Sequence, residues 1–108
     1  MMETILEKFK NTKDLIAIII IDLNLNIKEL NKLNEIQDTE LNNLIEILKK
    51  ILINKIDKNT NKVIFNYISF NYKENIIIIF SYKGFIIVLV GNKNLKEPII
   101  RSTIKSLN

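Results

Sequence analysis

The chain lacks histidine, cysteine and tryptophan, and its 108 residues include only two glycines and one proline. Without imidazole or thiolate groups it can form no Ser-His or Cys-His nucleophile pair, no zinc site of the usual nitrogen and sulfur kind, and no dithiol redox motif. Disulfide bonds are excluded for the same reason. These absences remove most enzyme classes, and we expect a non-enzymatic protein that uses no metal and no cofactor.

Long hydrophobic runs are also missing. The longest apolar runs cover residues 15–21, 76–80 and 85–90, far short of the roughly 18 residues that a membrane-spanning helix needs. The opening residues, MMET, lack the basic start and long apolar stretch of a signal peptide. We therefore expect a soluble, cytoplasmic protein.

The chain does have enough apolar material for one core. It is 47% hydrophobic and 26% charged, and a chain of this length suits a single domain over residues 1–108. Isoleucine, asparagine and lysine supply 55 of the 108 residues, a bias typical of AT-rich codons. The position of a residue therefore carries more information than its identity.

Positive charge gathers in the second half of the sequence. Residues 58–108 carry eight basic side chains against two acidic ones, a formal charge of +6, whereas residues 1–57 carry eight against ten, a charge of −2. A basic half can serve nucleic acid or an anionic surface. However, Lys73, Lys83 and Lys93 fall in or beside predicted turns, where lysines commonly keep strands soluble. Nucleic-acid or anionic-surface binding therefore stays as the alternative function.

The hydrophobic pattern predicts three helices and five strands without a linker or repeat. The helices are expected at residues 3–10, at 39–56 with Asp38 as the N-cap, and at 95–107 with Pro98 in the first turn. The strands are expected at residues 15–21, 27–30, 63–72, 76–82 and 85–90. The run at 15–21 has no polar alternation, which is typical of a central strand covered on both faces.

The long helix has more apolar surface than one sheet can cover. At 100° per residue, its core-facing stripe fills an arc of about 140° and consists of Leu41, Leu44, Ile45, Leu48, Ile51, Leu52 and Ile56. Ile47 and Ile53 lie outside the stripe and widen the apolar arc to about 240°. Part of this helix is therefore expected to meet a second surface, unless codon bias alone placed these two isoleucines on an exposed face.

Three segments of the chain carry a family resemblance. Residues 18–24, IIIIDLN, form an apolar strand that ends in an acidic residue and a turn. Residues 38–44, DTELNNL, begin an amphipathic helix with an acidic cap, and residues 88–95, VLVGNKNL, join a strand to a helix through a small turn. Together with the order of elements, these segments resemble the roadblock (dynein light chain) family of the profilin-like and longin-like fold group. The turn after Asp22 lacks the glycine that many members have there.

The resemblance implies an α+β fold with element order α-β-β-α-β-β-β-α. It implies a single five-stranded antiparallel sheet, with the long helix on one face and the two terminal helices on the other. In this family two copies pair through the third strand and the long helix, so the strand at 63–72 would be a long apolar edge that invites pairing. The residues expected in the dimer interface are Leu44, Ile47, Leu48, Ile51, Val63, Phe65 and Tyr67.

The same resemblance implies a partner class. Roadblock proteins commonly act as scaffolds or regulatory subunits that bind a small Ras-like GTPase, and the GTPase would dock on the composite surface of two long helices. A related roadblock chain could replace the second copy. A longin-like trafficking adaptor is a further alternative.

Two local motifs are assigned to structure and not to chemistry. Asp22, Asn24 and Asn26 have the spacing of calcium ligands, but Ile27 and Leu33 stand where the loop needs glycine and glutamate, so we predict a hairpin turn. The second motif is a group of aromatic residues, Tyr67, Phe70 and Tyr72, beside Lys73. Such a group could stack nucleic-acid bases, but the sequence has no RNP pattern, so we predict that these residues pack in the core and the dimer interface. Arg101, the only arginine, is expected in a solvated position on the last helix.

Overall fold

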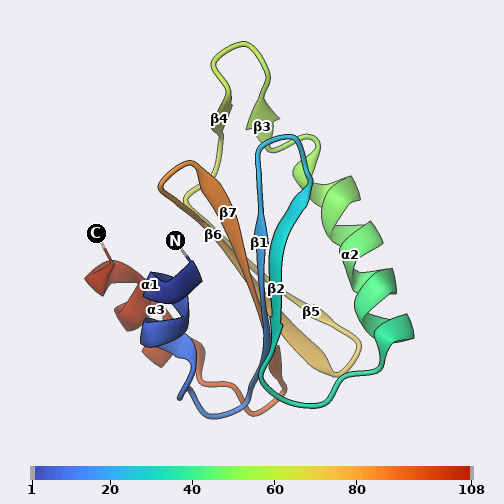
Figure 1. Ribbon diagram of the computed structural model, residues 1–108, viewed down its shortest axis with the longest axis vertical. Helices are drawn as coiled ribbons and strands as arrows, with labels where there is room; N and C mark the ends of the chain where they lie inside the picture. The colour runs from blue at the N-terminus through green and yellow to red at the C-terminus, as the bar shows by residue number, and fades with distance from the viewer. Residues whose placement is uncertain (1, 108) are drawn as a thin grey trace.

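A computed structural model describes residues 2–107 (Figure 1). Its helices are α1 (Met2–Phe9), α2 (Asp38–Leu52) and α3 (Glu97–Ser106). Its strands are β1 (Leu15–Ile21), β2 (Ile27–Lys32), β3 (Ile56–Asp57), β4 (Lys62–Val63), β5 (Tyr67–Tyr72), β6 (Asn75–Tyr82) and β7 (Phe85–Asn92). The predicted order of helices and main strands is confirmed, with the short β3 and β4 added.

The main sheet has the strand order β2-β1-β7-β6-β5, and all its pairs are antiparallel. The three inner strands consist mainly of isoleucine, valine, leucine and phenylalanine, which suits strands covered on both faces. This confirms the prediction that the run at 15–21 is central. The open edges of the sheet are β2 and β5.

Alternating side chains divide the core between the two faces of the sheet. Ile18 and Ile20 of β1 pack with residues of α1 and α3, whereas Ala17, Ile19 and Ile21 pack with α2. Because successive side chains of a strand point to opposite faces, this alternation fixes the layers. We call the two sides the α1/α3 face and the α2 face, and Figure 1 shows the helices on opposite sides of the sheet.

The segment between α2 and β5 differs from prediction. The predicted strand at 63–72 begins only at Tyr67, and the predicted helix ends at Leu52 instead of Ile56. The intervening residues form the β3–β4 hairpin, in which Ile56 pairs with Val63. The Asp57 carboxylate accepts hydrogen bonds from the backbone N–H groups of Asn59 at 2.9 Å and Thr60 at 3.4 Å. These hydrogen bonds form a tight turn at residues 57–61, for which the polar composition predicts only a loop.

Two predicted helix starts also need correction. Gln37 is the N-cap residue of α2, without a side-chain cap. Asp38 instead occupies the first turn, and its carboxylate accepts a hydrogen bond from the ammonium group of Lys32. Helix α3 starts at Glu97, two residues late, because a turn at Asn92 precedes it, in which the Asn92 side chain accepts the Asn94 N–H at 2.8 Å.

Both glycines stand at positions where the local backbone geometry favours glycine. Lys83 and Gly84 form the two-residue β6–β7 turn with φ values of 49° and 79°, the left-handed pair that such hairpins favour. Gly91 lies where a Cβ atom would approach the Leu95 Cβ to 2.9 Å. Its missing side chain lets the chain after β7 pack closely, which positions the start of α3 against the sheet.

Candidate protein-protein interface

The two edges of the main sheet differ in charge. The edge strand β2 reads IKELNK and carries three charged side chains, and its pairing with β1 has a register shift at Ile20/Ile21. The opposite edge strand, β5, reads YISFNY and carries none. Charges and bulges protect an edge from pairing with another chain, so β5 is the unprotected edge.

Beside this edge, apolar side chains lie half-buried on the α2 face. Ile68, Phe70 and Tyr72 of β5 pack against the α2-side cluster, and so does Phe65 just before the strand. All four keep part of their surface exposed. A half-buried apolar row next to unpaired backbone N–H and C=O groups can be covered further only by a partner.

Helix α2 adds two more half-buried apolar residues, Ile47 and Ile51. With 3.6 residues per turn, Ile51 and Ile47 lie about 60° and 100° from the buried Leu48 on one side of the helix. Asp38 and Ile53 lie about 80° and 140° from Leu48 on the other side. The two flanks of α2 therefore carry different residues.

Contacts identify which flank faces which edge. Asp38 pairs with Lys32 of β2, and Ile53 lines a hollow of about 440 Å³ together with Leu23 and Leu25 of the β1–β2 turn. The flank with Asp38 and Ile53 thus faces β2. By exclusion, the flank with Ile47 and Ile51 is directed towards the β5 side of the sheet, the side on which the apolar row lies. We call the set Ile47, Ile51, Phe65, Ile68 and Phe70 the β5-side strip.

The structure distributes the seven predicted interface residues over different places. Ile47, Ile51 and Phe65 belong to the β5-side strip. Leu44 and Leu48 are 1% and 0% exposed, so they lie beneath the strip in the chain's own core. Val63 belongs to β4.

Tyr67 also departs from the predicted grouping, because it packs on the α1/α3 face. Sequence reasoning missed Ile68 as a member of the strip, and it assigned Phe70 to core and dimer packing without including it among the seven interface residues. The signal available for them was the period-two alternation of residues 67–72, which places even-numbered side chains on the α2 face.

Tyr67 forms a separate polar cluster with α3. The Arg101 guanidinium carbon lies 4.2 Å from the centre of the Tyr67 ring, and its Nε and Nη2 donate to the Glu97 carboxylate at 3.1 and 3.0 Å. Ser69 Oγ also donates to Glu97, at 3.3 Å. Arg101 is exposed, as expected, but it also stacks on the Tyr67 ring and forms an ion pair with Glu97. It thereby joins α3 to the edge strand.

The hydroxyl of Tyr67 is buried and makes no hydrogen bond of normal geometry. Burial first, and then the neighbouring Glu97 carboxylate, raise the pKa of Tyr67 to about 12. Contacts with Tyr67 and Arg101 in turn lower the pKa of Glu97 below its ordinary value. The cluster therefore holds a neutral phenol beside an ionised carboxylate.

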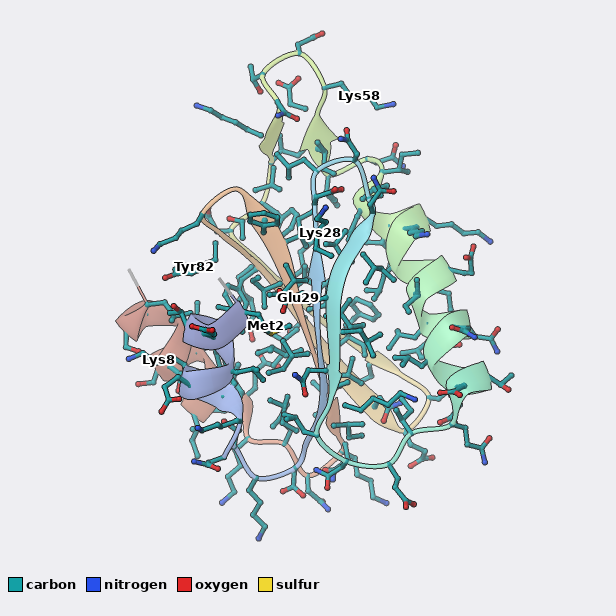
Figure 2. The ribbon with its side chains drawn as sticks, in the orientation of Figure 1. Met2, Lys8, Lys28, Glu29, Lys58 and Tyr82 are labelled. Atoms are coloured by element: carbon teal, nitrogen blue, oxygen red, sulfur yellow. The ribbon has the colours of Figure 1, made fainter. Side chains whose placement is uncertain are left out.

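The features considered for nucleic-acid binding are dispersed. Tyr67 lies on the opposite face of the sheet from Phe70 and Tyr72, so the three rings make no common stacking platform. Lys73 and Lys83 lie at opposite ends of β6, and Figure 2 shows Lys58 near the tip of the β3–β4 hairpin. Lys58, Lys73 and Lys83 therefore lie at separate places on the molecule.

Residues 2–107 contain no group of three or more carboxylates that could hold a metal ion. The Asp22 motif is a hairpin turn, as predicted, because its carboxylate accepts the N–H groups of Asn24 and Asn26, each at 2.9 Å. Within the same span, no helix has the length and apolar character that crossing a bilayer requires.

Comparison with solved structures places the fold among roadblock domains. MglC from Myxococcus xanthus superimposes with a TM-score of 0.70 and 13% identity, over 97% of this chain and 91% of MglC. M. xanthus MglB gives a TM-score of 0.63 and 13% identity over 89% and 80%. A Roadblock/LC7 domain from Streptomyces avermitilis gives 0.65 and 4% over 94% and 85%.

These likenesses show that the chain has the roadblock fold, as the sequence resemblance implied. No family model matches the sequence, and no curated protein matches it. The fold is thus shown by three-dimensional similarity, at identities where sequence comparison finds nothing.

Proposed function

We propose that this chain is a non-enzymatic, cytoplasmic homodimeric scaffold or regulatory subunit that binds a small Ras-like GTPase. The observation that carries the proposal is the uncharged β5 edge with the β5-side strip beside it. Two copies related by a twofold axis would pair their β5 strands and bring the two α2 helices together. Such pairing would cover unpaired backbone groups and half-buried apolar side chains in one step.

The GTPase partner is supported by the roadblock fold together with the outer surface of α2. In the dimer, two copies of this helix would lie side by side and present exposed polar side chains outward, among them Asn43, Glu46 and Lys50. A wide, mostly polar platform suits a docking partner that associates and dissociates. A related roadblock chain with the same uncharged edge could take the place of the second copy.

The dimer is tested by placing charges on the strip. Ile47→Glu combined with Ile51→Glu should convert the dimer to monomers, because pairing would bury the carboxylates in an apolar interface. Ile53→Glu is the matched control, since Ile53 is 49% exposed on the opposite flank of the same helix. Light scattering after size-exclusion chromatography measures the mass. An unchanged dimer mass in the double variant would remove α2 from the interface.

The GTPase is tested separately with the wild-type and monomeric proteins. A Ras-like GTPase that co-purifies from the native organism should bind wild-type protein and Ile53→Glu equally well. It should bind the Ile47→Glu, Ile51→Glu protein at least about tenfold more weakly, because only one of the two helices is then present. Equal binding to the monomeric variant would show that the composite surface is not the docking site.

A further inference from the structure

A second candidate site lies on the opposite face of the sheet from α2. A hollow of about 730 Å³ opens where the end of α1 and the loop after it meet the loop before α3. Its lining consists of Lys8, Asn11, Thr12, Lys13, Asp14, Asn94, Leu95, Lys96 and Ile99. The lining is rich in hydrogen-bond donors, with three ammonium groups, two amides and one hydroxyl.

The three lysines of the hollow come from three different segments: Lys8 from α1, Lys13 from the α1–β1 loop and Lys96 from the residue before α3. None of them takes part in an ion pair within residues 2–107. Folding therefore brings together three cations that have no carboxylate partner of their own, although two of them belong to the half of the sequence with net negative charge.

The single carboxylate of the hollow is already engaged. Asp14 accepts a hydrogen bond from the Asn92 amide at 3.0 Å, and its backbone carbonyl accepts the Asn92 N–H, also at 3.0 Å. Asp14 holds a left-handed backbone conformation with φ of 71°, which costs energy for a non-glycine residue. The strained loop that carries Lys13 is thus fixed against β7 at the rim of the hollow.

The hollow also has an apolar side. Leu95 is 6% exposed, whereas Ile99 on the first turns of α3 is 56% exposed. An isoleucine this exposed among three lysines leaves an apolar contact available beside the charged rim. Together these groups match a ligand with an anionic end and a short apolar portion.

We propose that this hollow binds a phosphate monoester carried on a short apolar group. A phosphate dianion offers three terminal oxygens that accept several donors at once. This fits a rim with three ammonium groups that have no ion-pair partner in the described part of the chain and a single carboxylate that already accepts the Asn92 amide. A free phosphate ester and a phospholipid headgroup share this chemistry. Because the hollow lies on the α1/α3 side and the β5-side strip on the α2 side, the site stays open in the proposed dimer and does not depend on it.

The first test uses n-butyl phosphate in an NMR titration of the uniformly labelled full chain. The expected result is saturable shifts at residues 8–14 and 94–99, with weaker binding of inorganic phosphate, which lacks the apolar group. Lys13→Glu combined with Lys96→Glu should weaken butyl phosphate binding at least about tenfold. The matched control is Lys62→Glu combined with Lys83→Glu, which changes the net charge equally away from the hollow and should bind as wild type.

The second test distinguishes the two sources of phosphate. The wild-type protein is sedimented with vesicles of phosphatidylcholine containing phosphatidic acid and with vesicles of phosphatidylcholine alone. Sedimentation only with phosphatidic acid, lost in the Lys13→Glu, Lys96→Glu protein and reduced by Ile99→Ser, assigns a lipid headgroup. Butyl phosphate binding without sedimentation assigns a free ester.

Three outcomes would overturn the proposal. One is the absence of saturable butyl phosphate shifts in the hollow together with no vesicle binding. Another is shifts spread evenly over lysines throughout the chain. The third is an equal loss of binding in the two double variants, which would show attraction to net charge alone. The spectrum of each free variant verifies that its fold is intact.

Discussion

At the scale of single residues, Tyr67 combines a stacked ring, a buried hydroxyl and a raised pKa. Its ring supports Arg101, while its hydroxyl is buried beside Glu97 without a hydrogen bond of normal geometry. A buried hydroxyl without a partner loses hydration and gains little in return. Its role is therefore carried by the ring, which anchors α3 to the edge strand.

Replacing Tyr67 by phenylalanine should accordingly change stability little at neutral pH. The free energy of unfolding is expected to stay within about 0.5 kcal/mol of the wild-type value, because the ring and its stacking are kept. Urea unfolding followed by circular dichroism measures it. Tyr67→Ala is the contrasting variant and should cost about 3 kcal/mol through lost packing. A large loss in the phenylalanine variant would mean that the hydroxyl has a bonding role.

The same residue predicts a pH dependence. Folding raises the pKa of Tyr67 from 10.0 to about 12, so the folded state favours the neutral phenol. The resulting stabilisation is fully present below pH 10 and is lost as the pH rises from about 10 towards 12. In urea unfolding, the difference between wild type and Tyr67→Phe should therefore shift against the wild type in this window. A difference that stays constant would contradict the raised pKa.

At the scale of elements, the sequence predicted those parts that depend on hydrophobic pattern alone. The unbroken run at 15–21 identified the central strand, and the apolar stripe identified α2. The two isoleucines outside that stripe, Ile47 and Ile53, lie on opposite flanks of the helix, and Ile51, expected to face the core, is only half-buried. The β3–β4 hairpin escaped prediction because it depends on backbone hydrogen bonds to Asp57. Residues 63–72 look like one continuous apolar strand in sequence. In the structure residues 64–66 belong to no strand, and pairing with β6 begins at Tyr67.

The position of Tyr67 on the α1/α3 face, apart from the other predicted interface residues, has a related cause. A strand apolar on both alternating sets gives no sign of which set faces which helix, and a one-residue shift exchanges the two faces. Once β5 is paired with β6, Tyr67 lies opposite Phe80 on the α1/α3 face and Ile68 opposite Ile79 on the α2 face. The edge position of the strand could be predicted from the family resemblance. Which of its residues belong to the β5-side strip could be assigned only from the register in which β5 pairs with β6.

The contrast between the two edge strands leads to a prediction about each. Asn71→Lys on β5 should weaken dimerisation at least about tenfold, because two added charges would meet where identical strands pair. Asn31→Lys on β2 is the matched control, because both asparagines lie on an edge strand and on the α1/α3 face. Asn71 pairs with Ile76 and Asn31 pairs with Ile18, and both isoleucines belong to that face. Sedimentation equilibrium measures the dissociation constant. Equal weakening by both variants would show that β5 is not the pairing edge.

At the scale of the whole molecule, one sheet divides the chain into two faces with different surface features. The α2 face carries the β5-side strip, and the α1/α3 face is closed by two helices and carries the lysine-rimmed hollow. The proposed twofold pairing would add the sheets edge to edge and leave both hollows at the far face. Self-association and ligand binding would then use separate surfaces of the same small domain.

Such a dimer should unfold in a manner that depends on protein concentration. Association stabilises the folded state by mass action, so a hundredfold increase in concentration adds about 2.7 kcal/mol per mole of dimer. For a dimer of two 12.7 kDa chains, this should raise the unfolding temperature by about 5 °C. Scanning calorimetry at several concentrations measures it, with the Ile47→Glu, Ile51→Glu protein as the control that should show no dependence. Salt screens charged contacts but has little effect on an apolar interface, so the dependence on concentration should persist at 0.5 M sodium chloride. If it disappeared at that salt concentration, the chains would associate through surface charge instead of the β5-side strip.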